Sequence, residues 1–280
     1  MKRFALMIMA ALIMLPQAVS AQKNNDEAEG LKVMSYNIRL GSGKDGTNSW
    51  ALRYTATEEM LKDQKPDVFG VQEALDYQVH YIEDMCGYES VGVGREDGKK
   101  EGEHMSIFWN KKTVSMLKWG TFWLSETPQK PSKGWDAACF RTATWALMKD
   151  KRTGKKFYFV NTHLDHEGKE AQKNGLKLIV EKIAEMNPEG LPMVLTGDFN
   201  IEPSNPALAD LDARMQSTRK IAEKTDDLTT YNGWGKSSMM IDYIYVSGFS
   251  SCPEYQTVTK RYEDRKFISD HYPIFARLIF

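Results

Sequence analysis

Cysteine is scarce in this sequence, whose 280 residues include only Cys86, Cys139 and Cys252. Three scattered cysteines exclude a disulfide-stapled scaffold and a cysteine-based zinc site. They allow one disulfide with one free thiol, but we expect buried, apolar cysteines instead. A metal ion bound by this chain would therefore use oxygen and imidazole ligands.

An excess of charge of one sign is also lacking. The 37 basic and 38 acidic side chains leave a formal net charge of −1, and the lysine pairs are scattered rather than gathered in a stripe. We therefore expect no strong non-specific binding to DNA, because such binding depends on many phosphate contacts from basic side chains. A local basic groove remains compatible with this composition.

Long apolar runs are absent except at the N-terminus. Lys2-Arg3 precedes an apolar run over residues 4–15, and Val19-Ser20-Ala21 forms a small-residue exit. This pattern predicts a signal peptide over residues 1–21, with export through the Sec pathway to the periplasm or the medium. A transmembrane anchor is the alternative, although the run is shorter than the roughly 20 residues that span a membrane. Residues 22–30 are polar and are predicted to form a flexible leader.

After this leader the sequence shows no repeat, low-complexity linker or shift in composition, so residues 31–280 are expected to form one domain. Apolar runs predict strands over residues 31–40, 68–71, 88–93, 105–109, 113–124, 141–149, 156–164, 192–198, 241–247, 255–261 and 273–279. Helical spacing predicts helices over residues 50–64, 76–85 and 167–186. This order favours mixed sheets covered by helices over a purely parallel wound sheet.

Polar side chains occur where the predicted strands end. They are Asn37, Gln72-Glu73, Asn161-Thr162-His163, Asp198, Asn200, Asp242 and Asp270-His271. Because side chains alternate along a strand, Asn161 and His163 share one face. A carboxylate inside an apolar strand, such as that of Asp242, is costly unless it meets a cation or a hydrogen-bond donor. Together these residues predict a binding crevice at the mouths of the strands.

Each of these residues also has a purely structural interpretation when taken alone. The alternatives are helix capping for Glu73, a polar turn for Asp198 and Asn200, turn chemistry for Asp270-His271, and a satisfied core position for His163. Asp242 has the weakest alternative, because a single acid among isoleucine, tyrosine and valine needs a partner. All these alternatives would have to hold at once, which favours the crevice.

The ordered motifs resemble those of the endonuclease/exonuclease/phosphatase superfamily, which has the deoxyribonuclease-I-like fold. The motifs are Met34-Ser-Tyr-Asn37, Gln72-Glu73, Asn161-Thr-His163, Gly197-Asp198-Phe-Asn200, Ile241-Asp242-Tyr and Ser269-Asp270-His271. The resemblance covers residues 31–280. Segments 122–128, 133–137 and 161–166 are most similar to the bacterial exported branch, which is related to eukaryotic poly(A)-shortening nucleases. The resemblance implies a four-layer α/β sandwich, in which two mixed β-sheets pack face to face with helices on both outer faces.

The resemblance further implies a role for each matched residue. Glu73 would be the main metal carboxylate, with Asn37 and Asp270 at the same metal site. Asp198 would orient or deprotonate the attacking water, Asn200 would hold a phosphate oxygen, His163 would donate to the phosphoryl group, and Asp242 would orient His271 against the phosphate. Glu103 matches a glutamate that positions the first histidine, and Arg141 matches a basic position facing the phosphate. Oxygen ligands favour Mg²⁺ or Mn²⁺ over Zn²⁺.

The sequence departs from the family pattern beside these motifs. His104 stands where a tyrosine is expected and Ser106 where a proline is expected, and segment 264–268 lacks the usual glycine. These differences bear on substrate fit rather than on hydrolysis.

Six of the seven tryptophans divide into two groups. Trp109, Trp119 and Trp145 lie in strand patterns and are predicted to be core residues. Trp123, Trp135 and Trp234 lie near loop signals, where ordinary packing and contact with a base, lipid or sugar both remain open.

We therefore expect an exported, metal-dependent phosphohydrolase that cleaves phosphodiester bonds, as a nuclease or phosphodiesterase, through in-line attack of an activated water. The expected partner is a phosphoester substrate: a nucleic acid, a nucleotide or a phospholipid headgroup. One alternative is a phosphomonoesterase or a sphingomyelinase-type headgroup hydrolase of the same fold, and another is a catalytically silent binding module. The oligomeric state is open, with a monomer as the simplest expectation.

Overall fold

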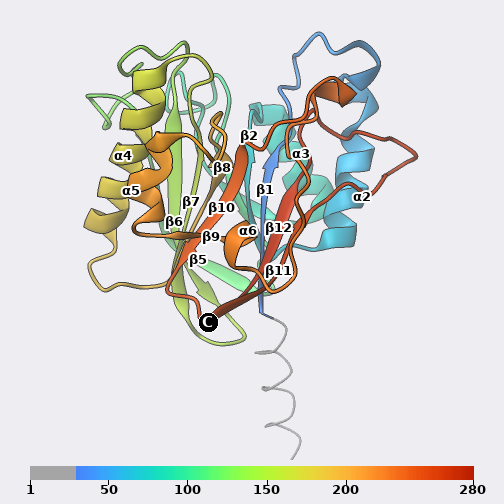
Figure 1. Cartoon of the computed structure of the whole chain (residues 1–280). Coiled ribbons are helices and arrows are strands. Elements are labelled where there is room, and N and C mark those ends of the chain that lie inside the picture. Colours follow the sequence, from blue (N-terminus) through green and yellow to red (C-terminus); the bar gives the residue numbers. More distant parts are fainter. Residues whose placement is uncertain (1–29) are drawn as a thin grey trace, which may run out of the picture.

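A computed structural model describes residues 30–280, and Figure 1 shows them as two β-sheets packed face to face with helices outside. The signal peptide predicted over residues 1–21 and the leader up to residue 29 lie outside the described residues. Within the described part of the chain, no helix is long and apolar enough to cross a membrane.

The first sheet has six strands in the order β11-β12-β1-β2-β4-β3. Their bounds are β1 (Leu31–Asn37), β2 (Val68–Gln72), β3 (Glu89–Val91), β4 (Ile107–Trp109), β11 (Ser251–Thr257) and β12 (Ile274–Ile279). The sheet is mixed, because β1 pairs in parallel with β2 and antiparallel with β12.

The second sheet has the order β5-β6-β7-β8-β10-β9. Its strands are β5 (Val114–Trp123), β6 (Thr142–Asp150), β7 (Lys156–His163), β8 (Met193–Asp198), β9 (Gln216–Ser217) and β10 (Asp242–Ser247). This sheet is also mixed, since β7 and β8 are parallel whereas β8 and β10 are antiparallel.

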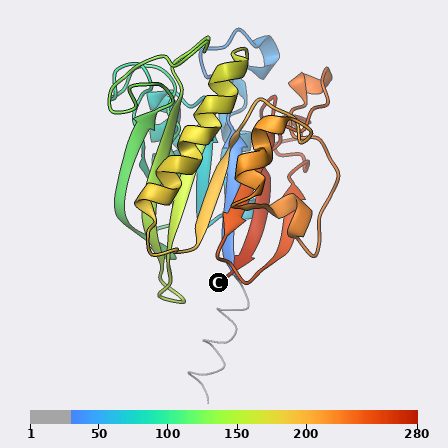
Figure 2. The same ribbon diagram turned by 60° about the vertical axis from the view of Figure 1, so that its left-hand side comes forward.

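Alternation along the strands builds the layers, because successive side chains point to opposite faces of a sheet. Val33 and Phe159 belong to the apolar core that joins the two sheets, and their neighbours Met34 and Val160 belong to the two outer cores. Helices α2 (Tyr54–Gln64) and α3 (Asp76–Cys86) cover the first sheet, and α4 (Lys169–Met186) covers the second (Figures 1 and 2). The predicted four-layer α/β sandwich is thus confirmed.

Short elements complete the described chain. They are α5 (Ala209–Asp212), α6 (Thr218–Ile221) and the 3₁₀ turns η1 (Gly46–Asn48), η2 (Trp50–Leu52), η3 (Pro206–Leu208) and η4 (Gly233–Gly235). Sequence analysis did not predict η1, η4, α5, α6 and β9, because two to four residues carry too little periodicity to be recognised, whereas η2 lies within the helix predicted over residues 50–64.

Two sequence predictions about elements need correction. The helix predicted over residues 50–64 is interrupted at Arg53, whose φ of −131° separates η2 from α2. The strand predicted over residues 255–261 is β11, which begins at Ser251 and ends at Thr257. A register shift between Ser251 and Glu254 disturbs the pattern there.

The tryptophan predictions are confirmed in part. Trp109 is buried as predicted, but Trp119 is 39% exposed, because β5 forms the edge of its sheet. Trp145 is half-buried. Trp123, placed near a loop by its sequence, is buried, and its indole N–H donates to the carbonyl of Arg95 at 2.7 Å.

All three cysteines are free thiols. Cys252 is buried as expected, whereas Cys86 and Cys139 are half-buried.

Candidate active site

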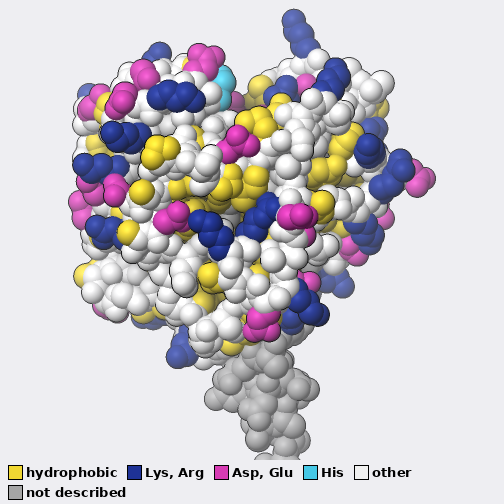
Figure 3. Space-filling view, viewed as in Figure 1, with side chains coloured by type: hydrophobic (Ala, Val, Ile, Leu, Met, Phe, Trp, Pro, Cys, Tyr) yellow, Lys and Arg dark blue, Asp and Glu magenta, His cyan; other side chains and the backbone are white. Residues whose placement is uncertain are grey.

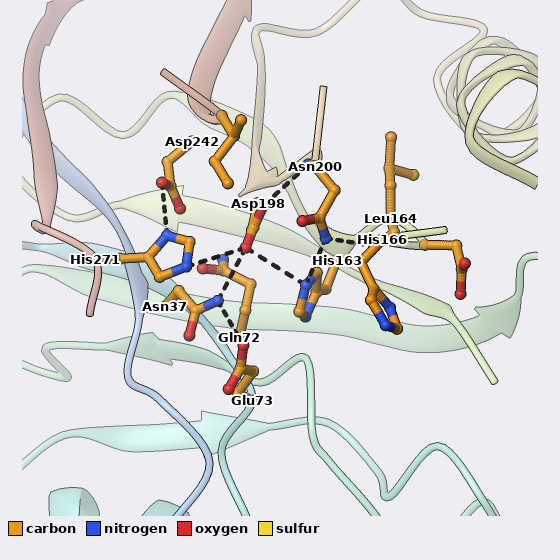
Figure 4. Close-up of polar contacts among 12 residues, drawn as sticks. Asn37, Gln72, Glu73, His163, Leu164, His166, Asp198, Asn200, Asp242 and His271 are labelled. Atoms are coloured by element: carbon orange, nitrogen blue, oxygen red, sulfur yellow. Dashed lines mark hydrogen bonds and ion pairs between the residues drawn. The ribbon is translucent and has the colours of Figure 1, made fainter. Parts of the chain in front are cut away.

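The strand topology brings the predicted polar residues to one edge of both sheets. Parallel strands β7 and β8 end at His163 and Asp198, which are register partners. Strand β10 runs the other way and begins at Asp242, the partner of Asp198. In the first sheet, β1 ends at Asn37 and β2 ends one residue before Glu73. Figure 4 shows these side chains converging from both sheets.

A cavity of about 500 Å³ opens at this edge. The molecule is visibly hollowed between its two halves at the top of Figure 3. The predicted site residues in the lining are Glu73, Glu103, Arg141, His163, Asp198, Asn200, Asp270 and His271. Asn37 and Asp242 lie behind this lining, each hydrogen-bonded to a lining residue.

Asn37 joins the acids of the two sheets. Its amide nitrogen donates to Glu73 Oε1 at 3.0 Å and to Asp198 Oδ2 at 2.9 Å. Its amide oxygen accepts from the backbone N–H of Arg39 at 3.0 Å. In this arrangement Asn37 positions the two carboxylates, its oxygen keeps a second lone pair, and its role as a metal ligand stays a prediction.

His271 lies between two carboxylates. Its Nδ1 contacts Asp242 Oδ2 at 2.8 Å, and its Nε2 lies 3.6 Å from Asp198 Oδ2. Burial alone would lower the pKa of His271, but the negative charges of Asp242 and Asp198 outweigh it and raise the pKa to about 10. The imidazolium form therefore predominates at neutral pH.

Asp198 is buried at the centre of the site. Besides Asn37 and His271 it meets the backbone N–H of Asn200 at 2.9 Å and His163 Nε2 at 3.4 Å. Burial raises the pKa of Asp198 to about 7, and the charge of nearby Asp242 contributes to the rise, although His271 opposes it. A carboxylate with this pKa can exchange a proton near neutral pH.

His163 differs from His271 in its protonation. Burial and the charges of Arg141 and Arg95 hold the pKa of His163 well below its usual value, so the ring is neutral. The Asn200 amide nitrogen donates to the carbonyl of Leu164 at 3.0 Å and lies 3.0 Å from His163 Nε2. Nε2 is then the acceptor, and the ring proton lies on Nδ1, which has no hydrogen-bond partner among the described residues.

Glu103 and Arg95 form an ion pair beside His163. Arg95 Nη1 donates to Glu103 Oε2 at 2.7 Å, and this oxygen lies 4.0 Å from His163 Nδ1. Burial raises the pKa of Glu103, although Arg95 opposes the rise. Glu103 therefore lies next to the first histidine, and its role in positioning that histidine stays a prediction.

Arg141 reaches the cavity from the start of the β6 region. Its Nε donates to Asp165 at 3.2 Å, its Nη2 lies 3.0 Å from His166 Nδ1, and its Nη1 has no hydrogen-bond partner in the described chain. Arg141 is only 5% exposed. A buried donor of this kind is suited to an anionic oxygen supplied by a ligand.

The donor set suits a hard divalent cation. Arg39 places guanidinium nitrogens 3.7 Å from Glu73 Oε2 and 3.7 Å from Asp270 Oδ2, so the space beside these carboxylates already attracts positive charge. Burial and the neighbouring Glu73 raise the pKa of Asp270. Two carboxylates facing one space are typical ligands for Mg²⁺ or Mn²⁺.

Two other clusters bring possible ligand atoms within 4.8 Å of one another. One comprises Asp198, Asp242 and His271, already joined by their own contacts. The other comprises Cys139, Asp165 and His166. Asp165 in this cluster accepts hydrogen bonds from several backbone N–H groups and from Arg141, so its oxygens are already occupied.

Asn161 serves a different purpose from its motif neighbours. Its amide nitrogen crosses from the second sheet to the carbonyl of Val71 at 2.7 Å, and its oxygen accepts from Gln72 at 2.7 Å. A Cβ at Gly70 would lie 2.3 Å from the Asn161 oxygen, so glycine is needed for this approach. Asn161 therefore joins the two sheets beneath the site.

Two site residues adopt left-handed backbone conformations. Glu73 has a φ of 64° and Asn200 a φ of 53°. Such angles are unfavourable for glutamate and persist where the surroundings impose them, as they often do at functional sites. Helix α3 has Leu75, not Glu73, at its N-cap position, so the capping alternative for Glu73 is wrong.

Comparison with known proteins identifies the family. A model of the "Endonuclease/Exonuclease/phosphatase family" matches residues 34–271. The chain belongs to this family. As an endonuclease/exonuclease/phosphatase protein it is a phosphoric ester hydrolase.

Two solved structures of Bacteroides proteins are similar to this family member. A mannosyl-6-phosphatase of Bacteroides thetaiotaomicron is 35% identical, with a TM-score of 0.84 over 89% of this chain and 100% of the other. An endonuclease/exonuclease/phosphatase protein of Bacteroides vulgatus is 34% identical, with a TM-score of 0.83 over 89% of this chain and 98% of the other. Sphingomyelinase C 2 of Leptospira interrogans is 23% identical over 91% of this chain but only 47% of that protein.

Sequence reasoning missed three side chains that shape this endonuclease/exonuclease/phosphatase site. Arg39 follows the Asn37 motif, and Asp165 follows the His163 strand, so both carried a signal as charged residues at strand ends. Arg95 lies in a loop between β3 and β4, and nothing in its local sequence indicates that it reaches the cavity.

Proposed function

We propose that this chain is a divalent-metal-dependent phosphomonoesterase that acts on a small phosphorylated alcohol outside the cytoplasm. The observation that carries the proposal is the pair of anion-binding donors in the cavity lining. Arg141 Nη1 is buried without a hydrogen-bond partner among residues 30–280, and the His271 imidazolium is a second, cationic donor. A monoester dianion offers one more unbridged oxygen and one more negative charge than a diester to such donors.

The similar proteins support a phosphomonoester substrate over a phosphodiester substrate. The relative with 35% identity, which this chain covers completely, is a mannosyl-6-phosphatase. The phosphodiesterase expected from sequence remains the second candidate, because the chain also resembles a sphingomyelinase at 23% identity. The apolar run predicted as a signal peptide supports export.

Asp198 is the group best suited to activate the attacking water. With a pKa near 7 and hydrogen bonds that fix both its oxygens, it can accept a proton at neutral pH. Asp242 holds His271 in its charged form, so that Nε2–H donates to the phosphoryl oxygens as negative charge develops. Arg141 supplies a further donor to the same cavity.

Glu73 and Asp270 would hold Mg²⁺ or Mn²⁺, which would add positive charge beside the phosphoryl oxygens. The Arg39 guanidinium lies 3.7 Å from each of these carboxylates, so a bound cation would either share this space with Arg39 or displace its side chain.

Initial hydrolysis rates of the purified mature chain test the proposal, with phosphate release followed for the monoesters and p-nitrophenol or the cleaved product followed for the diesters. With Mg²⁺ or Mn²⁺ we expect kcat/KM for p-nitrophenyl phosphate and for mannose 6-phosphate to exceed that for bis-p-nitrophenyl phosphate. A clear preference for the diester, or for sphingomyelin or oligonucleotides, would reject the monoesterase in favour of the second candidate. No turnover of any ester with either metal would favour a silent binding module.

A further inference from the structure

A second cavity adjoins the active-site cavity and is not used by the proposed reaction. It measures about 330 Å³ and is lined by Arg95, Glu96, Lys133, Ala138, Cys139 and Phe140. Arg95 and Cys139 also line the 500 Å³ cavity, so the two spaces meet at these residues. We call this second space the side cavity.

Arg95 is held rigidly where the cavities meet. Its backbone N–H donates to the carbonyl of Glu103 at 3.0 Å, and its own carbonyl accepts from Trp123. Its Nη1 is paired with the Glu103 carboxylate. Arg95 is only 8% exposed, and its Nε–H has no partner within the described chain. A buried donor without a partner favours a ligand that supplies an acceptor oxygen.

The remaining lining offers both hydrogen-bonding roles and one aromatic face. Glu96 is an exposed acceptor, Lys133 is an exposed donor, and the Phe140 ring is half-buried. A hydroxyl group can donate to one of these side chains and accept from another, which an alkyl chain cannot do. The C–H face of a ring can meanwhile pack on Phe140.

We propose that the side cavity binds the alcohol part of the substrate, and that this alcohol is a ring bearing several hydroxyl groups, as in a hexose 6-phosphate. The proposal rests on the proposed phosphomonoesterase function. Glu103 pairs with Arg95 and lies 4.0 Å from His163 Nδ1, so it links the lining of the side cavity to the first histidine. An alcohol that leaves the histidines on this side of the active-site cavity would meet Arg95.

A matched pair of substrates tests this specificity. Mannose 6-phosphate and cyclohexylmethyl phosphate both carry a primary phosphate on a six-membered ring, but only the first has ring hydroxyls. We expect the wild type to favour the hexose ester by about 100-fold or more in kcat/KM, because a site built for hydroxyls discriminates strongly against their absence.

Three substitutions should reduce this preference. Arg95→Lys keeps a cation for Glu103 but removes the Nε–H, and we expect the preference to fall about tenfold, mainly through KM for the hexose ester. Lys133→Met and Phe140→Ala should lower it by smaller factors. Lys130→Met is the matched control, because Lys130 is an exposed residue of the same loop and lines neither cavity. It should retain the wild-type preference.

The outcomes separate the two proposals. Equal kcat/KM for the two monoesters in the wild type, or equal loss of both in the variants, overturns the side-cavity proposal alone. Turnover of neither monoester, while bis-p-nitrophenyl phosphate is cleaved, overturns the proposed function and the side-cavity proposal with it.

Discussion

The two walls of the active-site cavity handle charge in different ways. The acidic wall consists of Asn37 at the end of β1, Glu73 just after β2, and Asp270 in the loop before β12. Its two carboxylates face Arg39 at 3.7 Å, and no imidazole is in direct contact with them in the described structure. The histidine wall consists of His163, Asp198 and Asp242 from the second sheet, together with His271, which reaches across to them.

This difference assigns different chemistry to each wall. Two acids on one side, with the pKa of Asp270 raised, form a place for a cation. Acids alternating with imidazoles, with pKa values of about 7 for Asp198 and about 10 for His271, form a place where protons move. Asn37 joins the walls, since its amide donates to both Glu73 and Asp198.

Removing the charge of Asp198 should have the largest effect. In Asp198→Asn the group that accepts the proton of water is lost, and we expect kcat to fall about 1,000-fold or more at every Mg²⁺ concentration. Initial rates of phosphate release measure this. Asp210→Asn, at an exposed position on α5, is the control. Near-normal turnover in Asp198→Asn would contradict the assignment of proton transfer to the histidine wall.

Arg53 supports the acidic wall from below. Its buried guanidinium donates to the carbonyls of Ile38, Arg39, Asn48 and Ile268. Arg53→Met would leave these carbonyls without their donor, and we expect a loss of about 3 kcal/mol in the free energy of unfolding.

Urea unfolding followed by circular dichroism measures that loss. Arg261→Met, which removes an exposed arginine from the loop before β12, should cost less than about 0.5 kcal/mol. Similar unfolding midpoints for the two variants would mean that Arg53 does not support the wall.

Weakening the acidic wall should change metal affinity more than chemistry. Glu73→Gln removes one negative charge from the cation site, and we expect about 30-fold more Mg²⁺ to be needed for half-maximal rate, with a smaller change in kcat at saturation. Glu89→Gln, at an exposed position in β3, is the matched control. An unchanged Mg²⁺ requirement in Glu73→Gln would show that Glu73 is not a ligand of the metal ion.

The smallest effect concerns the acid that supports Arg141. Burial alone would raise the pKa of Asp165, but backbone N–H groups and Arg141 outweigh it and hold the pKa well below its usual range. The stabilisation is therefore present above the unfolded value of about 4 and is lost as pH falls below it. Asp165→Asn should cost about 1–2 kcal/mol at pH 7.

The pH dependence distinguishes this interpretation from simple loss of packing. Between about pH 5 and pH 3, the free energy of unfolding of Asp165→Asn should fall less steeply than that of the wild type. Asp227→Asn, at an exposed position, should keep the wild-type slope. Parallel curves for wild type and Asp165→Asn would contradict a lowered pKa at Asp165.

The residues of the histidine wall could be predicted from the sequence better than the charged side chains around them. Asp198 and Asp242 lie within or at the end of apolar strands, where a carboxylate needs a partner, and strand order then brings them together. Arg95 lies in a loop, whose path depends on tertiary contacts that no local pattern records. The opposite pKa shifts of His163 and His271 likewise depend on which charges surround each buried ring.

The most direct test of the division between the two walls is a Mg²⁺ titration of the metal-stripped mature chain. The titration is run side by side on the wild type, Glu73→Gln and Asp198→Asn, with mannose 6-phosphate as substrate. We predict that excess Mg²⁺ restores most of the Glu73→Gln rate and none of the Asp198→Asn rate. Restoration of both variants, or of neither, would contradict the assignment of the cation to one wall and the proton to the other.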